Sequence, residues 1–124
     1  MEARKIIITG GATRMGAAIA RKLSGANKEI LIHYNKSKLK AEKLKKELEG
    51  NGTKVYLVKG DLSKEKDVNK IVKYAKLKLK YFDCLINNAS LFGPDNFLAI
   101  AAPIRVAPPV IIIFRASIFY LFFL

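Results

Sequence analysis

The 124-residue chain has little of what metal centres and disulfide frameworks require, since it contains one cysteine, Cys84, and one histidine, His33. A lone cysteine excludes an internal disulfide and a zinc cluster built from several thiolates. With a single histidine beside it, we expect no metal site. No local motif supports Ser-His-Asp chemistry, although the residue counts alone leave it open.

Acidic residues are also scarce, because 10 Asp and Glu stand against 23 Lys and Arg and leave a formal net charge of +13. Lysine supplies most of the surplus, in two runs within residues 36–46 and 64–80. Such runs can bind nucleic acid, but here they fall where the polar faces of two helices are expected. We interpret them as solvated helix surfaces. The 51% share of hydrophobic residues excludes disorder of the whole chain.

The N-terminus lacks the apolar run of a secretory signal, because Ile6–Ile8 is followed closely by Gly10 and Gly11. We therefore expect a cytoplasmic protein. Composition changes near residue 96: residues 1–96 hold 21 of the 23 basic residues and all 10 acids, whereas residues 97–124 are nearly all apolar. We expect an α/β half domain at residues 1–96 and a divergent hydrophobic tail at residues 97–124.

Short apolar runs alternate with charged helical patterns along residues 1–96. The runs at 5–9, 29–33, 53–58 and 83–86 are typical of strands buried on both faces. Helical spacing of apolar residues separates them, and we expect Ser63 to cap the third helix. Strands that alternate with helices require crossover connections. The order β-α-β-α-β-α-β predicts an α/β fold, a Rossmann-type parallel sheet with flanking helices, incomplete and followed by the apolar tail.

A glycine-rich turn, residues 9–16, joins the first expected strand to the first helix. A helix N-terminus offers unpaired amides and the positive end of the helix dipole to an anion. Glycine lets the backbone of the turn approach a phosphate closely. A position between strand and helix is the context that a dinucleotide-binding motif requires. The alternative is a glycine-rich turn that holds no ligand.

This turn, Thr9-Gly10-x-x-x-Arg14-x-Gly16, resembles the cofactor motif of the short-chain dehydrogenases/reductases. Most members have glycine where this chain has Arg14, and an arginine there is similar to the pteridine-reductase branch. Three further segments resemble the family at the ends of the next strands: His33-Tyr34-Asn35-Lys36-Ser37, Gly60-Asp61-Leu62 and Asn87-Asn88-Ala89-Ser90. The resemblance covers about residues 4–93.

The resemblance implies an NADPH-dependent oxidoreductase that transfers hydride to a pterin or to another small carbonyl or imine substrate. It implies that Asp61 faces the adenine and that the asparagines after the fourth strand line the nicotinamide side. The cofactor contacts carried over by the resemblance are Gly10, Arg14, Met15, Gly16, His33, Tyr34, Asn35, Lys36, Ser37, Asp61, Leu62, Asn88, Ala89 and Ser90.

The end of the second strand discriminates between NAD and NADP. An NAD site usually places a carboxylate there, which bonds the ribose 2′-hydroxyl and would repel a 2′-phosphate. This chain has no acid between His33 and Glu42. Lys36 supplies a positive charge, and Arg14 can reach the same phosphate with a planar guanidinium. We therefore predict NADP(H), although Lys36 alone could be a surface lysine and Asp61 an ordinary capping residue.

The acid–base pair of the family is missing. The resemblance implies a Tyr-x-x-x-Lys pair well after the Asn-Asn-Ala segment, but no lysine follows residue 80. Tyr34 and Lys38, like Tyr74 and Lys78, have the spacing but precede that segment. We expect no catalytic residue in this chain, and a truncated, inactive portion of the reductase. The alternative function is a non-catalytic nucleotide-binding or basic RNA-binding module.

The tail contains two apolar runs, residues 110–114 and 118–124, around Arg115. Each is shorter than the roughly 20 residues that span a bilayer, so insertion requires Arg115 to reach the membrane surface. A frayed or aggregation-prone strand segment, rich in β-branched and aromatic residues, is the second interpretation. A third is a homo-oligomer in which the tail covers apolar surface that would otherwise stay bare.

Overall fold

The computed structural model describes residues 3–89 and the backbone of residues 110–117. It contains one sheet with the strand order β3-β2-β1-β4-β5. The strands are β1 (Arg4–Thr9), β2 (Lys28–Tyr34), β3 (Lys54–Lys59), β4 (Tyr81–Asn87) and β5 (Val110–Ser117), and the helices are α1 (Arg14–Leu23), α2 (Lys38–Glu49) and α3 (Glu65–Leu79). The predicted alternation of strands and helices from β1 to β4 is confirmed, as is the α/β fold.

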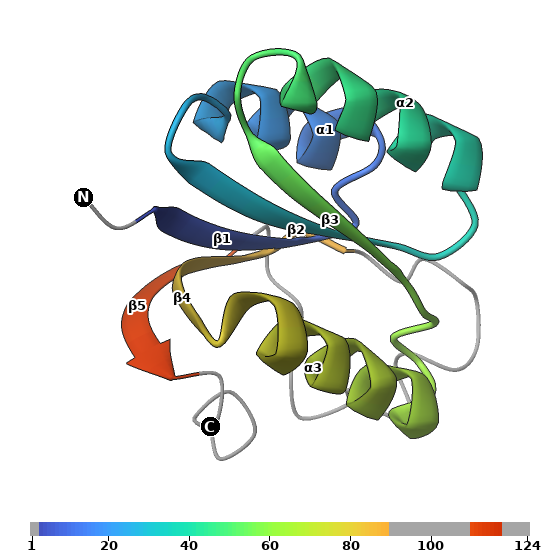
Figure 1. The fold of residues 1–124 in the computed structure, drawn as a ribbon. Helices are drawn as coiled ribbons and strands as arrows, with labels where there is room; N and C mark the ends of the chain where they lie inside the picture. The colour runs from blue at the N-terminus through green and yellow to red at the C-terminus, as the bar shows by residue number, and fades with distance from the viewer. Residues whose placement is uncertain (1–2, 90–109, 118–124) are drawn as a thin grey trace.

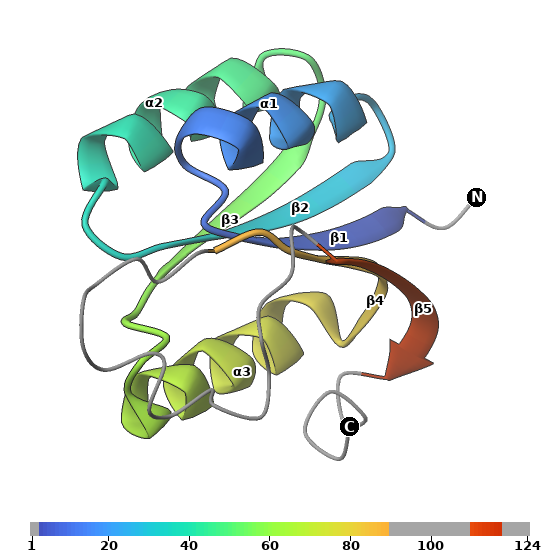
Figure 2. The same cartoon turned by 180° about the vertical axis from the view of Figure 1, so that it is seen from behind.

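Strands β1 to β4 run parallel, and helices cover both faces of the sheet. Helices α1 and α2 lie together on one face, and α3 lies on the other (Figure 1). The view from behind shows the same two layers around the sheet (Figure 2). Because each crossover between parallel strands needs a helix on a face, the fold follows from the order of elements.

Burial on both faces explains why the strands are continuous apolar runs. Along β1, Ile6 and Ile8 pack in the cluster beneath α1 and α2, whereas Ile7 packs in the cluster against α3. Small residues of α1, Ala17 and Ala20, are buried and allow this helix to lie close to the sheet. The two cores therefore share the same strands, and alternate residues serve opposite helices.

Strand β5 comes from the apolar tail and pairs antiparallel with β4. Its register sets Ile113 opposite Cys84 and Ile111 opposite Ile86, with an irregularity between Phe82 and Cys84. Part of the tail therefore forms a paired strand of the sheet, whereas the sequence interpretation was a frayed or aggregation-prone strand segment. No helix in the described part of the chain is long and apolar enough to cross a membrane. The expected boundary at residue 96 lies outside the described residues.

The prediction that Ser63 caps α3 is wrong. Helix α3 begins at Glu65, with Lys64 at its cap position. The Ser63 hydroxyl instead donates to Oδ1 of Asp61 at 2.6 Å, and its backbone amide donates to the same oxygen at 2.9 Å. A short polar side chain before a helix can form such a local turn as readily as a cap, because both satisfy nearby backbone groups.

We predict that Leu31→Ala destabilises the fold by about 2–5 kcal/mol, because Leu31 is fully buried and its truncation leaves a cavity. The matched control is Leu39→Ala, since Leu39 is 81% exposed in α2, and its effect should stay within about 0.5 kcal/mol. Urea denaturation followed by circular dichroism measures both. Equal midpoints for the two variants would contradict the packing described here.

Candidate functional site

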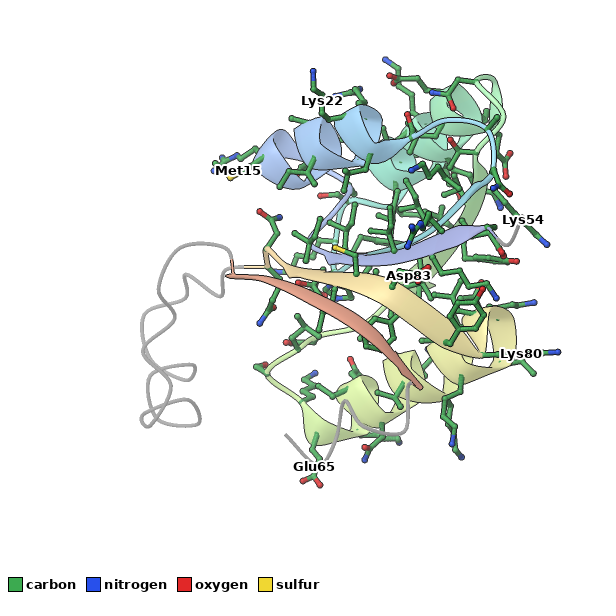
Figure 3. The ribbon with its side chains drawn as sticks, turned by 90° about the vertical axis from the view of Figure 1, so that its left-hand side faces the viewer. Met15, Lys22, Lys54, Glu65, Lys80 and Asp83 are labelled. Atoms are coloured by element: carbon green, nitrogen blue, oxygen red, sulfur yellow. The ribbon has the colours of Figure 1, made fainter. Side chains whose placement is uncertain are left out.

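The carboxyl ends of four parallel strands meet at one edge of the sheet. The glycine turn follows β1, Tyr34 ends β2, Gly60 follows β3, and Asn88 follows β4. Strand β1 lies between β2 and β4, so β2 and β3 are added on one side of β1 and β4 is added on the other side. Such a reversal of strand order is where open α/β sheets bind ligands. Met15 projects at this edge, whereas Lys54 and Lys80 lie at the opposite end (Figure 3).

The glycine turn has no room for side chains at two positions. A Cβ on Gly16 would lie 2.2 Å from the Gly10 carbonyl oxygen and 2.6 Å from Nδ2 of Asn88. Gly10 has φ 61°, and a Cβ there would lie 3.0 Å from the Ala89 Cα. These close approaches show that the turn packs tightly against the end of β4, with Gly16 buried at the start of α1. Only glycine allows the backbone to pack this closely, and the packing places the N-terminus of α1 at the carboxyl edge of the sheet.

The amides at the start of α1 are not capped by the Thr13 side chain. Thr13, at the cap position, is extended with φ −139° and ψ 161°, and its side chain makes no capping hydrogen bond. The first amides of a helix have no intrahelical acceptor. No acidic residue occupies the first turn of α1. The geometry therefore fits a phosphate or diphosphate group at this helix end.

Asn88 and Thr9 join the glycine turn to the end of β4. The side-chain amide of Asn88 donates to the carbonyl oxygens of Thr9 at 3.3 Å and Gly10 at 3.1 Å. The Thr9 hydroxyl accepts hydrogen bonds from the amides of Asn88 and Ala89, each at 3.0 Å. Asn87 is exposed, and its Oδ1 accepts from the Thr9 hydroxyl at 3.1 Å. These hydrogen bonds thus hold the ends of β1 and β4 at a fixed separation.

His33 lies beneath the same edge, between two glycine turns. Its side chain is buried, its Nδ1 accepts from the Gly10 amide at 3.1 Å, and its Nε2 lies 2.7 Å from the Gly60 carbonyl oxygen. Burial lowers the pKa of His33, and the opposing effects of the Gly60 hydrogen bond and the Asp61 charge are smaller. The ring is therefore neutral at pH 7. It contacts the turns, and its place supports a positioning role.

Arg14 adopts a backbone conformation that favours glycine. Its φ is 48°, in the left-handed region, and its side chain is exposed. A residue with a Cβ costs roughly 1–2 kcal/mol more than glycine in this region. This conformation gives the physical reason for glycine at the corresponding position in most members of the family that the motif resembles.

Two exposed cations follow the first two strands at the predicted site, Arg14 after β1 and Lys36 after β2. Lys36 is exposed, and Ser37 occupies the cap position of α2 without a capping side-chain bond. Neither Arg14 nor Lys36 takes part in an ion pair within residues 3–89. Within those residues no carboxylate forms an ion pair with either side chain, although the Asp61 charge acts on Lys36 at longer range, and a phosphate could bind both cations.

Asp61 is held in a local turn beside this positive charge. The hydroxyl and amide of Ser63 donate to its carboxylate and hold the pKa of Asp61 below its ordinary value, with smaller effects from Lys64 and Lys36. Its own amide donates to Oδ2 of Asp67 at 2.8 Å. The residue is thus charged at neutral pH, and one carboxylate oxygen is already bonded to Ser63.

The other residues that were predicted to contact the coenzyme lie in different parts of the structure. Tyr34 packs partly against the core beneath α1 and α2, and Leu62 against the core beneath α3. Asn35 is half-buried, and Ser90 lies outside the described residues. Sequence reasoning missed three roles: the Thr9 hydroxyl as an acceptor, the Asp67 carboxylate as an acceptor, and the His33 ring as a bridge between two turns. These roles depend on partners from distant segments, which no local pattern signals.

Comparison with known proteins identifies related structures. The family model described as short chain dehydrogenase matches residues 4–105. A short-chain dehydrogenase from Oenococcus oeni is 32% identical, with a TM-score of 0.64, over 82% of this chain and 48% of that chain. FolM alternative dihydrofolate reductase 1 from Brucella canis, complexed with NADP, is 34% identical, with a TM-score of 0.64, over 74% of this chain and 37% of its own.

A blue fluorescent protein from a metagenomic library, in complex with NADPH, is 31% identical, with a TM-score of 0.67, over 77% of this chain and 40% of its own. The chain thus matches less than half the length of each of these three structures.

We predict that Gly16→Ala lowers stability by about 1–3 kcal/mol, because its Cβ would overlap the Gly10 carbonyl. Gly50→Ala is the matched control, since Gly50 has a helical φ of −63° that alanine readily adopts. That variant should be neutral or more stable by up to about 1 kcal/mol. Urea denaturation compares the two. Equal tolerance of both alanines would show that the turn has more room than this geometry allows.

Proposed function

Because this chain belongs to the short-chain dehydrogenase family, we propose that it binds NADP(H) at the carboxyl edge of its sheet. The amides at the start of α1 bind the diphosphate, and Arg14 and Lys36 bind the 2′-phosphate on the adenosine ribose. The observation that carries this proposal is the glycine turn, where Gly10 and Gly16 leave no space for a Cβ and α1 begins without a capping side chain. Relatives crystallised with NADP or NADPH support the choice of coenzyme.

The preference for NADP over NAD rests on charge. No acidic residue lies between the end of β2 and Glu42 in α2. A 2′-phosphate at this place meets Lys36 and Arg14 instead of a carboxylate. Ser37 adds a hydroxyl that is not used to cap α2. Asp61, held by Ser63, lies on the neighbouring turn and serves the adenine.

The substrate class of the whole protein is a pterin or another small carbonyl or imine compound. The arginine in the glycine turn and the His-Tyr-Asn-Lys-Ser segment support the pteridine-reductase branch, and one relative is named a dihydrofolate reductase. Residues 1–96 are the coenzyme-binding half. This 124-residue chain has no Tyr-x-x-x-Lys pair after Asn88, so its proposed role by itself is coenzyme binding without turnover.

We predict that Arg14→Gly raises stability by about 1 kcal/mol, because glycine relieves the positive φ of 48°. The same change should weaken NADPH binding about tenfold, since a charged hydrogen-bond donor to the phosphate is lost. Lys80→Gly is the control, because Lys80 also has a positive φ, 65°, but lies at the opposite end of the sheet. It should gain stability with unchanged NADPH affinity, as measured by urea denaturation and calorimetry. A loss of stability in Arg14→Gly would oppose the strain argument.

The double variant Arg14→Gly/Lys36→Glu tests the coenzyme assignment. We expect it to bind NADPH at least about 100-fold more weakly than the parent, because two positive contacts are lost and a carboxylate repels the 2′-phosphate. NADH binding should be retained or improved. Calorimetry with both coenzymes measures the preference. Unchanged NADPH binding would refute the 2′-phosphate site, and absence of heat with either coenzyme on the folded parent would refute the proposed function.

A further inference from the structure

The His33 ring connects two turns that the proposed coenzyme site uses separately. Gly10 belongs to the turn before α1, and Gly60 directly precedes Asp61 after β3. The ring bonds both, with Nδ1 to the Gly10 amide at 3.1 Å and Nε2 to the Gly60 carbonyl oxygen at 2.7 Å. His33 is 3% exposed, so water does not compete freely for these partners.

The backbone of β2 strengthens the same connection. The Gly11 amide donates to the His33 carbonyl oxygen at 3.0 Å, and the Gly60 amide donates to the Tyr34 carbonyl oxygen at 3.0 Å. Each glycine turn is therefore bound twice at the end of β2, once by the main chain and once by the ring. The turns cannot shift relative to each other without breaking ring or backbone hydrogen bonds.

One protonation state of the ring satisfies both partners. The Gly10 amide is a donor, so Nδ1 must be unprotonated, and the Gly60 carbonyl is an acceptor, so Nε2 must carry the hydrogen. Burial favours this neutral form and lowers the pKa of His33. Asp61 is the charged group that acts on the ring in the opposite direction, and Lys36 in turn acts on Asp61. An imidazolium could not accept from Gly10.

We propose that His33 is a positioning residue for the coenzyme: its neutral ring fixes the diphosphate-binding turn at Gly10 in register with the adenine-side turn at Gly60. The inference rests on the proposed NADP(H) site and deepens it. Neither ring nitrogen is left for the coenzyme, because each already has a backbone partner. His33 therefore acts through Gly10 and Gly60, and the two ends of the adenosine diphosphate portion bind to one rigid unit.

Two substitutions separate the two bonds of the ring. In His33→Asn the side-chain oxygen can take the place of Nδ1 and accept from Gly10, whereas the bond to Gly60 is lost. In His33→Gln the terminal amide nitrogen can take the place of Nε2 and donate to Gly60, whereas the acceptor for Gly10 is lost. The probes are NADPH, which contains the diphosphate, and adenosine, which has neither the diphosphate nor the 2′-phosphate and therefore does not depend on Arg14.

We expect calorimetry at pH 7.5 to show that the two variants lose affinity for different ligands. His33→Gln should lose about tenfold in NADPH affinity and keep its affinity for adenosine within about twofold. His33→Asn should lose more affinity for adenosine than His33→Gln does, and should lose less affinity for NADPH. Equal losses for both ligands in both variants, or no loss in either, would overturn the positioning role. A parent protein that binds neither ligand would instead refute the proposed function.

A measurement on the unaltered protein keeps the inference testable if both variants fail to fold. In ¹⁵N-labelled protein the Gly10 amide signal should move with the same midpoint as the His33 ring as the pH falls below 6.5, the ordinary value for histidine. The physical reason is that a protonated Nδ1 no longer accepts from that amide. The exposed Gly50 amide, bonded to Lys46, is the internal control and should not follow the ring. A Gly10 amide signal that stays constant while the His33 ring titrates would overturn the inference.

Discussion

The side-chain amide of Asn88 donates to the carbonyl oxygens of Thr9 and Gly10, and this contact sets the geometry of the whole carboxyl edge. It holds the end of β4 against the end of β1, where the strand order reverses. Gly16 then passes so close to Gly10 and Asn88 that a Cβ would overlap both. The N-terminus of α1 is held at this edge because these strand ends and the turn are packed together.

Charge is distributed unevenly between the two ends of the strands. At the amino end, Asp83 accepts from the Lys5 amide at 2.9 Å, and the Lys5 ammonium donates to the Leu79 carbonyl and lies 3.9 Å from Glu29. Acids there are used to hold strands and the end of α3 together. Arg14 and Lys36, at the carboxyl end, have no ion-pair partner within residues 3–89. Two cations without an ion-pair partner in that range therefore lie at the edge where a phosphate would bind.

The sequence was sufficient for the order of elements, because buried parallel strands leave continuous apolar runs and glycine marks the turn before α1. It also placed the motifs correctly at successive strand ends, since parallel strands bring those ends to one edge. It failed for Ser63, because a hydroxyl near a helix start can serve a local turn or a cap with similar energy. The partners of His33 come from segments 23 and 27 residues away, which no local pattern reports. The antiparallel pairing of β5 depends likewise on the path of the chain and not on its apolar composition.

The backbone strain at Arg14 argues for a ligand at this edge of the sheet. Glycine would serve the backbone better at φ 48°, so arginine at this place is a cost to folding. The side chain is exposed and therefore recovers little of that cost by burial. Arg14 follows β1 and Lys36 follows β2 at the same edge of the sheet, and the neutral His33 ring binds the backbone of the turn at Gly10. A strained, exposed cation on a rigid turn gains most when an anion binds it, and the extra phosphate of NADP(H) is an anion of the required charge and place.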